Sequence, residues 1–352
     1  MTRKQANIGL VGATGLVGQC ILQILSERRF PAGSLKLWAS SKSAGKKVKF
    51  GRKTFPVNPI DPNDFAGCDL IFFAGTEGEK GASRVFSAAA IKAGAVVIDN
   101  GSDYRMDPAV PLVVPEVNPG DAFTHRGLIA NPNCSTIQMA VALNLIHRKL
   151  GLKRIVVSTY QAVSGAGKAG IIALEEQMQP FGRGFGTLRR AAQGKNSKFK
   201  IQNSPFSRQI AGNVIPQISD FAEMGFSGEE WKMVKETQKI FHDHKIAVNA
   251  TTVRVPVDTG HSESIYFDTR EKAGLGTIEK LLAKTPGVIF SKNSYHTPLE
   301  IAGRDEVFVS RLRPDPFDPQ AFVMWVAADN LRKGAATNAV QIAELLYKGG
   351  KL

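Results

Sequence analysis

The first third of the chain alternates short apolar runs with longer segments whose apolar residues recur at helical spacing. Near-continuous apolar runs are typical of parallel strands buried on both faces. Strands are predicted over residues 7–12, 34–39, 69–74 and 95–100, and helices over residues 15–27 and 78–94. Because crossovers between parallel strands are right-handed, the alternation predicts a doubly wound α/β domain at the start of the chain.

The pattern changes after about residue 150, where apolar and polar positions alternate more strictly. Such alternation is typical of a mixed or antiparallel sheet with one covered face. These strands are predicted over residues 154–161, 251–257, 263–268, 306–313 and 322–328. An amphipathic helix over residues 330–350, ended by glycines, closes the chain. The fold class is therefore α/β, with a doubly wound first domain and an α+β second domain built on a mixed sheet.

Length and cysteine usage narrow the protein class. The chain has 352 residues, which suggests about two domains at roughly 150 residues each. No apolar run reaches the ~18 residues of a membrane span, and the N-terminus lacks a secretory signal pattern. The three cysteines are widely spaced, without a CxxC pair, which fits a reducing compartment and predicts a cytoplasmic protein without a zinc site. His242 and His244 could bind a metal, but a charged turn is the favoured interpretation.

The net charge of +14 admits two kinds of anionic partner, nucleic acid and small phosphorylated ligands. The densest basic stretch, residues 182–200, is interpreted as an exposed loop with a short helix. No aromatic platform is interleaved with its charges, so a nucleic-acid contact there is the less favoured alternative. We expect small-molecule partners, with no nucleic acid and no membrane.

A glycine motif lies between the first strand and the first helix. "VGATGLVG" places Gly12, Gly15 and Gly18 at three-residue spacing, which permits a tight turn and close approach of a diphosphate to a helix N-terminus. NAD sites commonly place an acidic residue about 20 residues further on. Here "WASSKSAGKK" supplies hydroxyl groups and a cation instead, which favours the 2′-phosphate of NADP; its residues are Ser40, Ser41, Lys42 and Ser43.

Cys134 follows a predicted strand, residues 128–130, and a polar turn, and it begins a long helical segment. Two interpretations compete for this cysteine. A free cysteine is often simply a small buried apolar residue. Alternatively, the unpaired N–H groups and partial positive charge of a helix start would lower the thiol pKa and make Cys134 a nucleophile.

Other candidates lie in the second half of the chain. Gln161 ends a predicted strand. Arg254 and His261 are seven residues apart, and a turn at Gly260 could fold the histidine back toward the arginine. Each is also compatible with an ordinary edge or core residue.

The predicted helix over residues 228–241 has an apolar face and a polar face that carries Glu229, Lys232 and Glu236. The pattern alone favours a surface ion-pair face. However, Met233 and Ile240 fall near this face, so it could also be covered by a ligand site.

Taken together, these motifs resemble the aspartate-β-semialdehyde dehydrogenase family along nearly the whole chain. The resemblance rests on "GATGLVG", "DNGSDYRMDPAVPLVVPEVNP", "NPNCSTI", "QAVSGAGKAG", "GNVIPQI", "RVPVDTGHSES" and "AADNLRKGAATNAVQIAELL". It implies that Cys134 is the nucleophile, His261 the acid–base residue and Gln161 the residue that orients the substrate. It implies further that the substrate carboxylate, amino group and phosphate are bound by Arg254, by Glu229, and by Arg105 with Lys232.

The same resemblance implies the cofactor and the activity. Residues 1–133 would form an NADP-binding Rossmann-like domain, 134–329 a catalytic and dimerisation domain, and 330–352 a helix that returns to the first domain. The reaction would be the NADPH-dependent conversion of 4-aspartyl phosphate to aspartate 4-semialdehyde and phosphate, in lysine (diaminopimelate), threonine, methionine and isoleucine biosynthesis, by a homodimer. The implied cofactor-binding residues are Gly12, Thr14, Gly15, Leu16, Val17, Ser40, Ser41, Ser43, Ser164, Gly165, Asn330 and Gly334.

Three rival hypotheses remain at this point. An N-acetyl-γ-glutamyl-phosphate reductase would share the architecture but would not need Glu229 for a free amino group. A glyceraldehyde-3-phosphate dehydrogenase would normally carry an acidic residue after the second strand. A non-enzymatic basic binding protein is the third, and the presence of Cys134, Gln161, Arg254 and His261 together argues against it.

Overall fold

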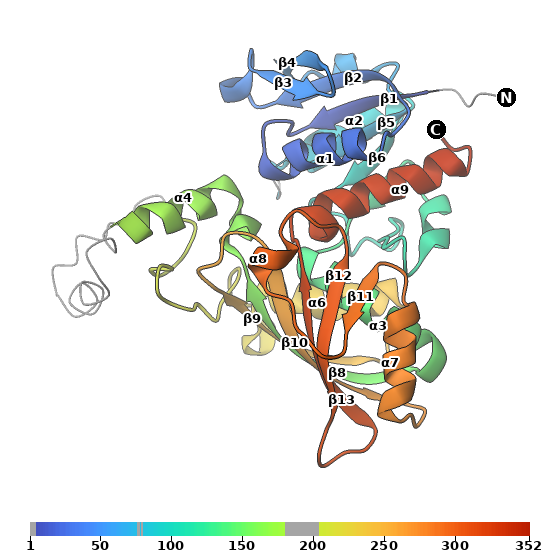
Figure 1. Ribbon diagram of the computed structural model, residues 1–352. Coiled ribbons are helices and arrows are strands. Elements are labelled where there is room, and N and C mark those ends of the chain that lie inside the picture. The colour runs from blue at the N-terminus through green and yellow to red at the C-terminus, as the bar shows by residue number, and fades with distance from the viewer. Residues whose placement is uncertain (1–4, 76–77, 79, 180–203) are drawn as a thin grey trace.

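Figure 1 shows the computed structural model, which describes residues 5–75, 78, 80–179 and 204–352. Within these residues the strands form two sheets, one in each of two lobes that lie above one another in Figure 1. The C-terminal helix α9 (Thr337–Lys348) lies between the lobes, and helix α4 (Gly167–Met178) projects to one side. The predicted loop at residues 182–200 lies outside the described residues.

The first sheet has the order β3-β4-β2-β1-β5-β6-β7 within the described chain. Its pairings are parallel except at β3–β4, and its inner strand β5 is buried along its whole length, as expected for strands covered on both faces. This confirms the doubly wound prediction. The bounds are β1 (Ala6–Val11), β2 (Ala32–Ala39), β3 (Lys47–Phe50), β4 (Lys53–Pro59), β5 (Leu70–Phe73), β6 (Val96–Asp99) and β7 (Leu128–Ala130).

Helices α1 (Leu16–Glu27), α2 (Ala82–Lys92) and α9 pack on this sheet. Val340 and Ile342 of α9 share a buried cluster with Ile21 and Leu25 of α1. The prediction of one continuous helix over residues 330–350 is wrong in its first part, because residues Arg332–Ala336 form a π-helical turn. The Asp329 side chain accepts hydrogen bonds from the amides that start this turn.

The second sheet has the order β11-β12-β13-β10-β8-β9 in the described residues, and it mixes parallel and antiparallel pairs, as predicted. The bounds are β8 (Leu152–Gln161), β9 (Ala247–Arg254), β10 (His261–Thr269), β11 (Val288–Ser291), β12 (Val307–Pro314) and β13 (Ala321–Ala328). The sequence pattern missed β3, β4 and β11, whose side chains are mostly exposed or only partly buried.

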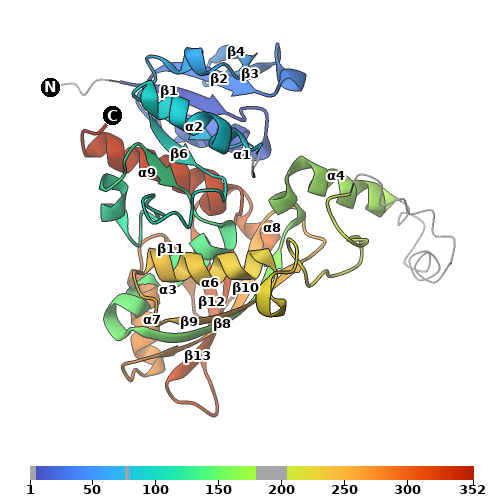
Figure 2. The same ribbon diagram turned by 180° about the vertical axis from the view of Figure 1, so that it is seen from behind.

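Helices α3 (Cys134–Leu150) and α6 (Gly228–Ile240) cover one face of this sheet; α6 lies across the front of the second lobe in Figure 2 and packs against β9. Helix α7 (Leu275–Lys284) packs beside β11 and β12, and the short α8 (Pro298–Ile301) beside β13. On the other face, Val156 and Tyr160 of β8 are 40% and 38% exposed. The sheet therefore has one covered face and one face with exposed apolar side chains.

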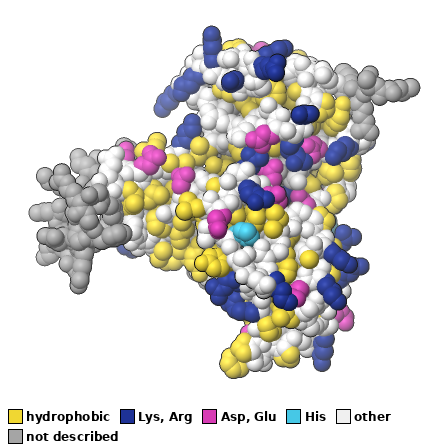
Figure 3. Space-filling view, viewed as in Figure 1, with side chains coloured by type: hydrophobic (Ala, Val, Ile, Leu, Met, Phe, Trp, Pro, Cys, Tyr) yellow, Lys and Arg dark blue, Asp and Glu magenta, His cyan; other side chains and the backbone are white. Residues whose placement is uncertain are grey.

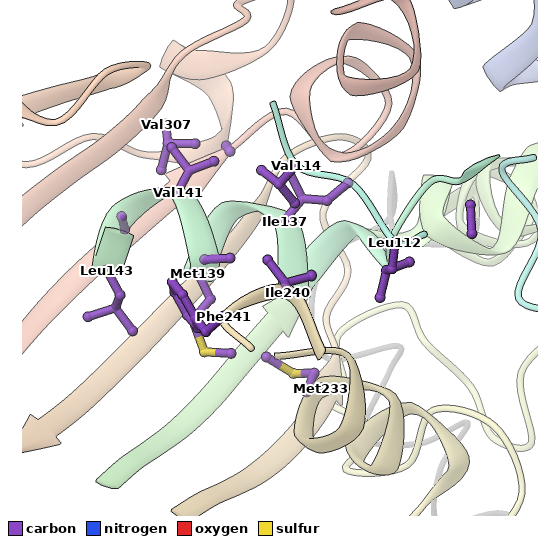
Figure 4. Close-up of a cluster of buried hydrophobic side chains, with 14 of the residues drawn as sticks. Leu112, Val114, Ile137, Met139, Val141, Leu143, Met233, Ile240, Phe241 and Val307 are labelled. Carbon is purple, nitrogen blue, oxygen red and sulfur yellow. The ribbon is translucent and has the colours of Figure 1, made fainter. Parts of the chain in front are cut away.

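Apolar side chains of α3 and α6 meet in a common core. Ile137 and Met139 of α3 lie toward Met233 and Ile240 of α6 in Figure 4, and all four are fully buried. The carboxylates Glu229 and Glu236 on the same side of α6 are buried as well. The interpretation of this side as a surface ion-pair face is therefore wrong, and the alternative that it is covered is confirmed.

Surface features bear on the partner hypotheses. In the described part of the chain, no helix combines the length and the apolar character that a membrane crossing requires. His242 lies in a turn after α6, where its Nε2 pairs with a carboxylate oxygen of Asp121 at 2.8 Å. The face seen in Figure 3 carries Lys and Arg in separate groups, interspersed with acidic and apolar side chains.

Candidate active site

Cys134 is the first residue of α3, at the point where β7 has ended and the chain turns into the second lobe. The Asn133 side chain caps the helix by accepting hydrogen bonds from the amides of Ser135 and Thr136 at 3.0 and 3.3 Å. Cys134 opens into a cavity of about 380 Å³ between the lobes. In doubly wound sheets, ligands bind outside the carboxyl ends of the strands, and this cavity lies next to the ends of β6 and β7.

Sheet topology brings the other predicted residues to the same place. Gln161 ends β8, and it pairs with Arg254 at the end of the parallel strand β9. Strand β10 is antiparallel to β8, so its first residue, His261, lies beside the end of β8. All three are buried, and Gln161 and Arg254 line the cavity that holds Cys134.

His261 lies beneath the cavity wall, fully buried. The Ala162 amide donates to its Nδ1 at 3.0 Å, so the neutral ring carries its proton on Nε2. That Nε2 has no hydrogen-bond partner among the described residues. A Cβ on Gly165 would lie 2.7 Å from an Arg254 nitrogen and 3.4 Å from His261 Nε2, so the missing side chain leaves room for both groups. Burial and then Arg254 lower the pKa of His261 to about 3.

Glu229 joins several of the polar groups of the cavity. Its Oε1 accepts from Asn133 Nδ2 at 2.8 Å and from Gln161 Nε2 at 3.1 Å, and its Oε2 lies 3.3 Å from Lys232 Nζ. Burial acts to raise the pKa of Glu229, but Lys232 and these two amides outweigh it and the pKa is lowered. Glu229 is therefore a buried carboxylate that keeps its negative charge.

Arg105 follows β6 and lines the cavity together with Lys232. Its guanidinium donates to Glu236 Oε1 at 3.1 Å and to the backbone oxygens of Gly101 and Asn100, each at 3.0 Å. Arg254 donates to the Ala162 oxygen at 2.7 Å. Arg105, Lys232 and Arg254 thus bring three cationic groups to one cavity, which suits an anionic substrate.

The electrostatics of Cys134 differ from the sequence-based expectation. Burial raises the pKa of the Cys134 thiol to about 12, and Glu229 adds to the rise, whereas Arg254 and Arg105 oppose it. The expectation that the helix start lowers the pKa is therefore wrong for the ligand-free protein, because the loss of hydration in the narrow cavity outweighs the helix start and both arginines.

The raised pKa of the Cys134 thiol predicts how the alkylation rate of this cysteine depends on pH. Below its pKa a thiol gains about tenfold in thiolate per pH unit. Because the pKa of Cys134 lies at about 12, its rate with iodoacetamide should still rise at pH ~10, beyond the usual thiol range. Site-resolved mass spectrometry over a pH series measures this rate. A plateau below pH ~8 would mean that the thiol is activated in the free protein.

The glycine turn has the geometry of a diphosphate-binding loop. Gly12 has φ of 88°, and a Cβ there would lie 2.4 Å from the Ala74 oxygen. A Cβ on Gly18 would lie 2.2 Å from the Gly12 oxygen, so helix α1 can start close to the turn only with glycine at this position. Thr14 Oγ1 and Ser43 Oγ lie 3.2 Å apart, which brings the serine loop next to the glycine turn. These residues fit a dinucleotide whose diphosphate lies at the start of α1.

The predicted cofactor residues divide into two sets. One set lines the cavity of Cys134 and includes Val17, Ser164, Gly165, Asn330 and Gly334. The other set lies at the glycine turn and the serine loop and includes Gly12, Thr14, Gly15, Leu16, Ser40, Ser41 and Ser43. Lys168 connects the lobes by donating to the Thr14 oxygen at 2.9 Å. Val17 of α1 lines the cavity of Cys134, and the same helix starts at the glycine turn, so the two sets are joined through α1.

No role could be assigned from the sequence to Asn133 or Glu236, which contact the residues around the cavity. Asn133 contacts both Glu229 and Glu236, and Glu236 contacts Arg105. Glu236 follows Glu229 by seven residues, about two helical turns, so the shared face was visible in the sequence. Its partners lie far away along the chain, and the pattern alone could not identify them. In the described residues, no group of three or more His, Cys, Asp or Glu side chains could hold a metal ion.

Comparisons with known proteins agree with this arrangement. Residues 7–125 match the family described as semialdehyde dehydrogenase, NAD binding domain, and residues 143–333 match the semialdehyde dehydrogenase, dimerisation domain. The aspartate-semialdehyde dehydrogenase of Aquifex aeolicus is 49% identical over 351 residues, which cover 97% of this chain and 98% of that protein. That of Bacillus subtilis is 43% identical over 347 residues, which cover 97% of each.

A solved structure supports the same assignment. The crystal structure of aspartate semialdehyde dehydrogenase II from Vibrio cholerae, complexed with ASA, has a TM-score of 0.89 at 44% identity and covers 98% of this chain and 99% of its own. The full-length matches carry the name of one of the families considered from the sequence and not those of its rivals. From the motifs, the two-lobed fold and these matches, the chain belongs to the aspartate-semialdehyde dehydrogenase family.

Proposed function

We propose that the protein catalyses the NADPH-dependent reductive dephosphorylation of L-4-aspartyl phosphate to L-aspartate 4-semialdehyde and phosphate, reversibly, in the biosynthesis of lysine, threonine, methionine and isoleucine. The observation that carries the proposal is the composition of one cavity. It holds a cysteine at a helix start together with Gln161, Glu229, Arg254, Arg105 and Lys232.

The proposed substrate roles follow from charge and shape. Arg254 offers a planar guanidinium that can grip the α-carboxylate with parallel hydrogen bonds. Glu229, which keeps its charge, receives the α-amino group. Arg105 and Lys232 receive the phosphoryl group, because both line the cavity and two cations match its charge. These contacts would place the acyl carbon near Cys134, with Gln161 orienting it.

In the proposed reaction, Cys134 Sγ attacks the acyl carbon, the C–O bond to phosphate breaks, and the thiol proton leaves with the phosphate. The product is a thioacyl enzyme. NADPH, when bound, supplies the hydride that reduces the thioacyl carbon. The resulting thiohemiacetal expels Cys134 as the thiolate, which takes up a proton, and releases the aldehyde. The amides at the start of α3 can stabilise the oxyanion.

For His261 the structure favours a modified role. The sequence resemblance implies a residue that shuttles protons, which requires Nε2 to accept a proton. Because Ala162 donates to Nδ1, the neutral ring already carries the proton on Nε2. We therefore assign to His261 the role of a hydrogen-bond donor through Nε2–H; because the ring lies behind Gly165 and does not line the cavity, substrate binding has to expose Nε2 before it can reach the oxygen of the thioacyl group, where negative charge develops.

The proposed coenzyme is NADP. Lys42 and the hydroxyls of Ser40, Ser41 and Ser43 belong to the turn after β2, the part of the chain where an NAD site usually has a carboxylate. A 2′-phosphate is attracted by the cation and the hydroxyl donors, and a carboxylate would repel it. The specificity constant should therefore be higher for NADP than for NAD with the same substrate. Equal constants, or a preference for NAD, would refute the assignment of this loop.

Assembly and organisation are also proposed. We infer a homodimer that forms through the second sheet, because the matched segment is described as a dimerisation domain and the exposed face of this sheet carries Val156 and Tyr160. Light scattering, which gives the mass in solution, tests the dimer.

The proposed domains are residues 1–133 for NADP binding, 134–329 for catalysis and dimerisation, and 330–352 for the helix that returns to the first domain. The cytoplasmic location stays a prediction.

One assay tests the proposed function. Aspartate 4-semialdehyde, NADP and inorganic phosphate are mixed with the protein, and NADPH is followed by absorbance. We expect reduction of NADP that depends on both phosphate and aspartate 4-semialdehyde. The matched substrate is N-acetylglutamate 5-semialdehyde, which lacks a free amino group for Glu229. A higher specificity constant for that substrate would favour the rival reductase and contradict the proposal.

A further inference from the structure

Helix α6 carries two buried carboxylates that hold Asn133 from two sides. Glu229 Oε1 accepts from Asn133 Nδ2 at 2.8 Å, and Glu236 Oε2 accepts from the Asn133 backbone amide at 2.6 Å. Asn133 is the N-cap of α3 and immediately precedes Cys134. The position of Cys134 therefore depends on two carboxylates of a different helix.

The second oxygen of Glu236 holds Arg105. Arg105 Nη1 donates to Glu236 Oε1 at 3.1 Å, and the side chains of the pair are only 7% and 1% exposed. Arg105 lies in the segment after β6, and Asn133 lies after β7, so the two belong to neighbouring strand ends of the first sheet. One carboxylate of the second lobe thus connects both segments.

We propose that Glu236 is a positioning residue for the phosphate half of the reaction: it fixes the guanidinium of Arg105 relative to Cys134. The inference rests on the proposed phosphate role of Arg105. When Arg105 binds the phosphoryl group of the acyl phosphate, the acyl carbon attached to that group must lie within reach of Sγ, and small errors in this geometry slow the attack. Because Glu236 accepts hydrogen bonds from Arg105 and from the Asn133 amide at once, it fixes the distance between the Arg105 guanidinium and Cys134.

Glu236→Gln tests this inference. The amide keeps one acceptor oxygen and gains a donor group, so it can accept from Asn133 or from Arg105 but not from both. The new NH₂ group of the glutamine then faces either the Arg105 guanidinium or the Asn133 amide, and both of these are donors. We expect the KM for phosphate to rise about ten- to hundredfold, which is the scale of a lost charge-assisted hydrogen bond. The KM for aspartate semialdehyde should change by less than about threefold, and the NADP dissociation constant should stay the same.

Glu230→Gln is the matched control. Glu230 is a buried carboxylate on the same helix, and its oxygens accept from the Ser227 and Thr252 amides at 2.7 and 2.9 Å. It does not belong to the residues that line the cavity. We expect this variant to lose thermal stability, as the loss of a buried acceptor requires, while the KM for phosphate stays within about twofold of the parent value.

A third variant separates this inference from the proposed function. If Arg105→Gln leaves the KM for phosphate unchanged, the phosphate role of Arg105 itself is wrong. If Arg105→Gln raises that KM but Glu236→Gln raises it no more than Glu230→Gln does, the positioning role of Glu236 is overturned while the proposed function stands. Should Glu236→Gln fail to fold, Glu236→Asp takes its place, since the shorter carboxylate cannot reach both partners, and the same criteria apply.

Discussion

Cys134→Ser should give a folded protein that has lost at least about 10³-fold in turnover. A serine hydroxyl has nearly the size of the thiol, so the N-terminus of α3 and its Asn133 cap should persist. The hydroxyl is much less acidic than a thiol and forms a poorer nucleophile near neutral pH. The measurement is the initial rate of phosphate-dependent NADP reduction, together with a thermal melt to establish folding.

Cys20→Ser is the control, since Cys20 is also a half-buried free cysteine but lies on α1. It should keep most of the turnover. Substrate protection gives a second line of evidence: aspartate semialdehyde should slow the alkylation of Cys134 and leave that of Cys20 unchanged. An active Cys134→Ser variant, or labelling that substrate does not affect, would make Cys134 a merely structural residue.

The fold was largely predictable because its strands are short apolar runs with clear ends. The runs at residues 69–74 and 95–100 became β5 and β6 with small changes at the ends. The β3–β4 hairpin escaped because its lysines and arginine hide the alternation, and most of its side chains are exposed. The π-helical turn before α9 escaped because it depends on the Asp329 carboxylate, a contact that helical periodicity does not reveal.

The candidate site was predictable in composition but not in electrostatics. Motifs at strand ends named Gln161, Arg254 and His261, and the sheet topology brings them together. The thiol pKa of Cys134 depends on how much water the cavity excludes and on the distances to Arg254, Arg105 and Glu229. Those distances arise from four segments that are remote in sequence. For the same reason the sequence could not show whether the polar face of α6, with Glu229 and Glu236, is buried or exposed to solvent.

Arg254→Lys should lower the specificity constant for aspartate semialdehyde by about one to two decades while leaving the NADP dissociation constant unchanged. Lysine keeps the charge but replaces a two-pronged planar donor by a point ammonium. The loss of a charge-assisted hydrogen bond is worth roughly 1.5–3 kcal/mol, and poorer orientation of the reacting carbon adds to it. Arg254 is also buried and donates to the Ala162 oxygen at 2.7 Å, next to the amide that fixes His261. Lysine cannot reproduce the hydrogen bond to the Ala162 oxygen, so Arg254→Lys should also disturb the position of His261.

Arg270→Lys provides the matched control, because Arg270 also lies at the end of a strand of the second sheet but pairs with Asp243 at 2.8 Å, away from the residues that line the cavity. Such partly exposed pairs contribute little, so its specificity constant should stay within about twofold of the parent. If Arg254 served only to hold the Ala162 oxygen, a substrate analogue without the α-carboxylate would lose as much activity in the variant as aspartate semialdehyde does. A carboxylate-binding role requires the opposite: the analogue is already poor with the parent enzyme, and Arg254→Lys should change its rate by less than about threefold.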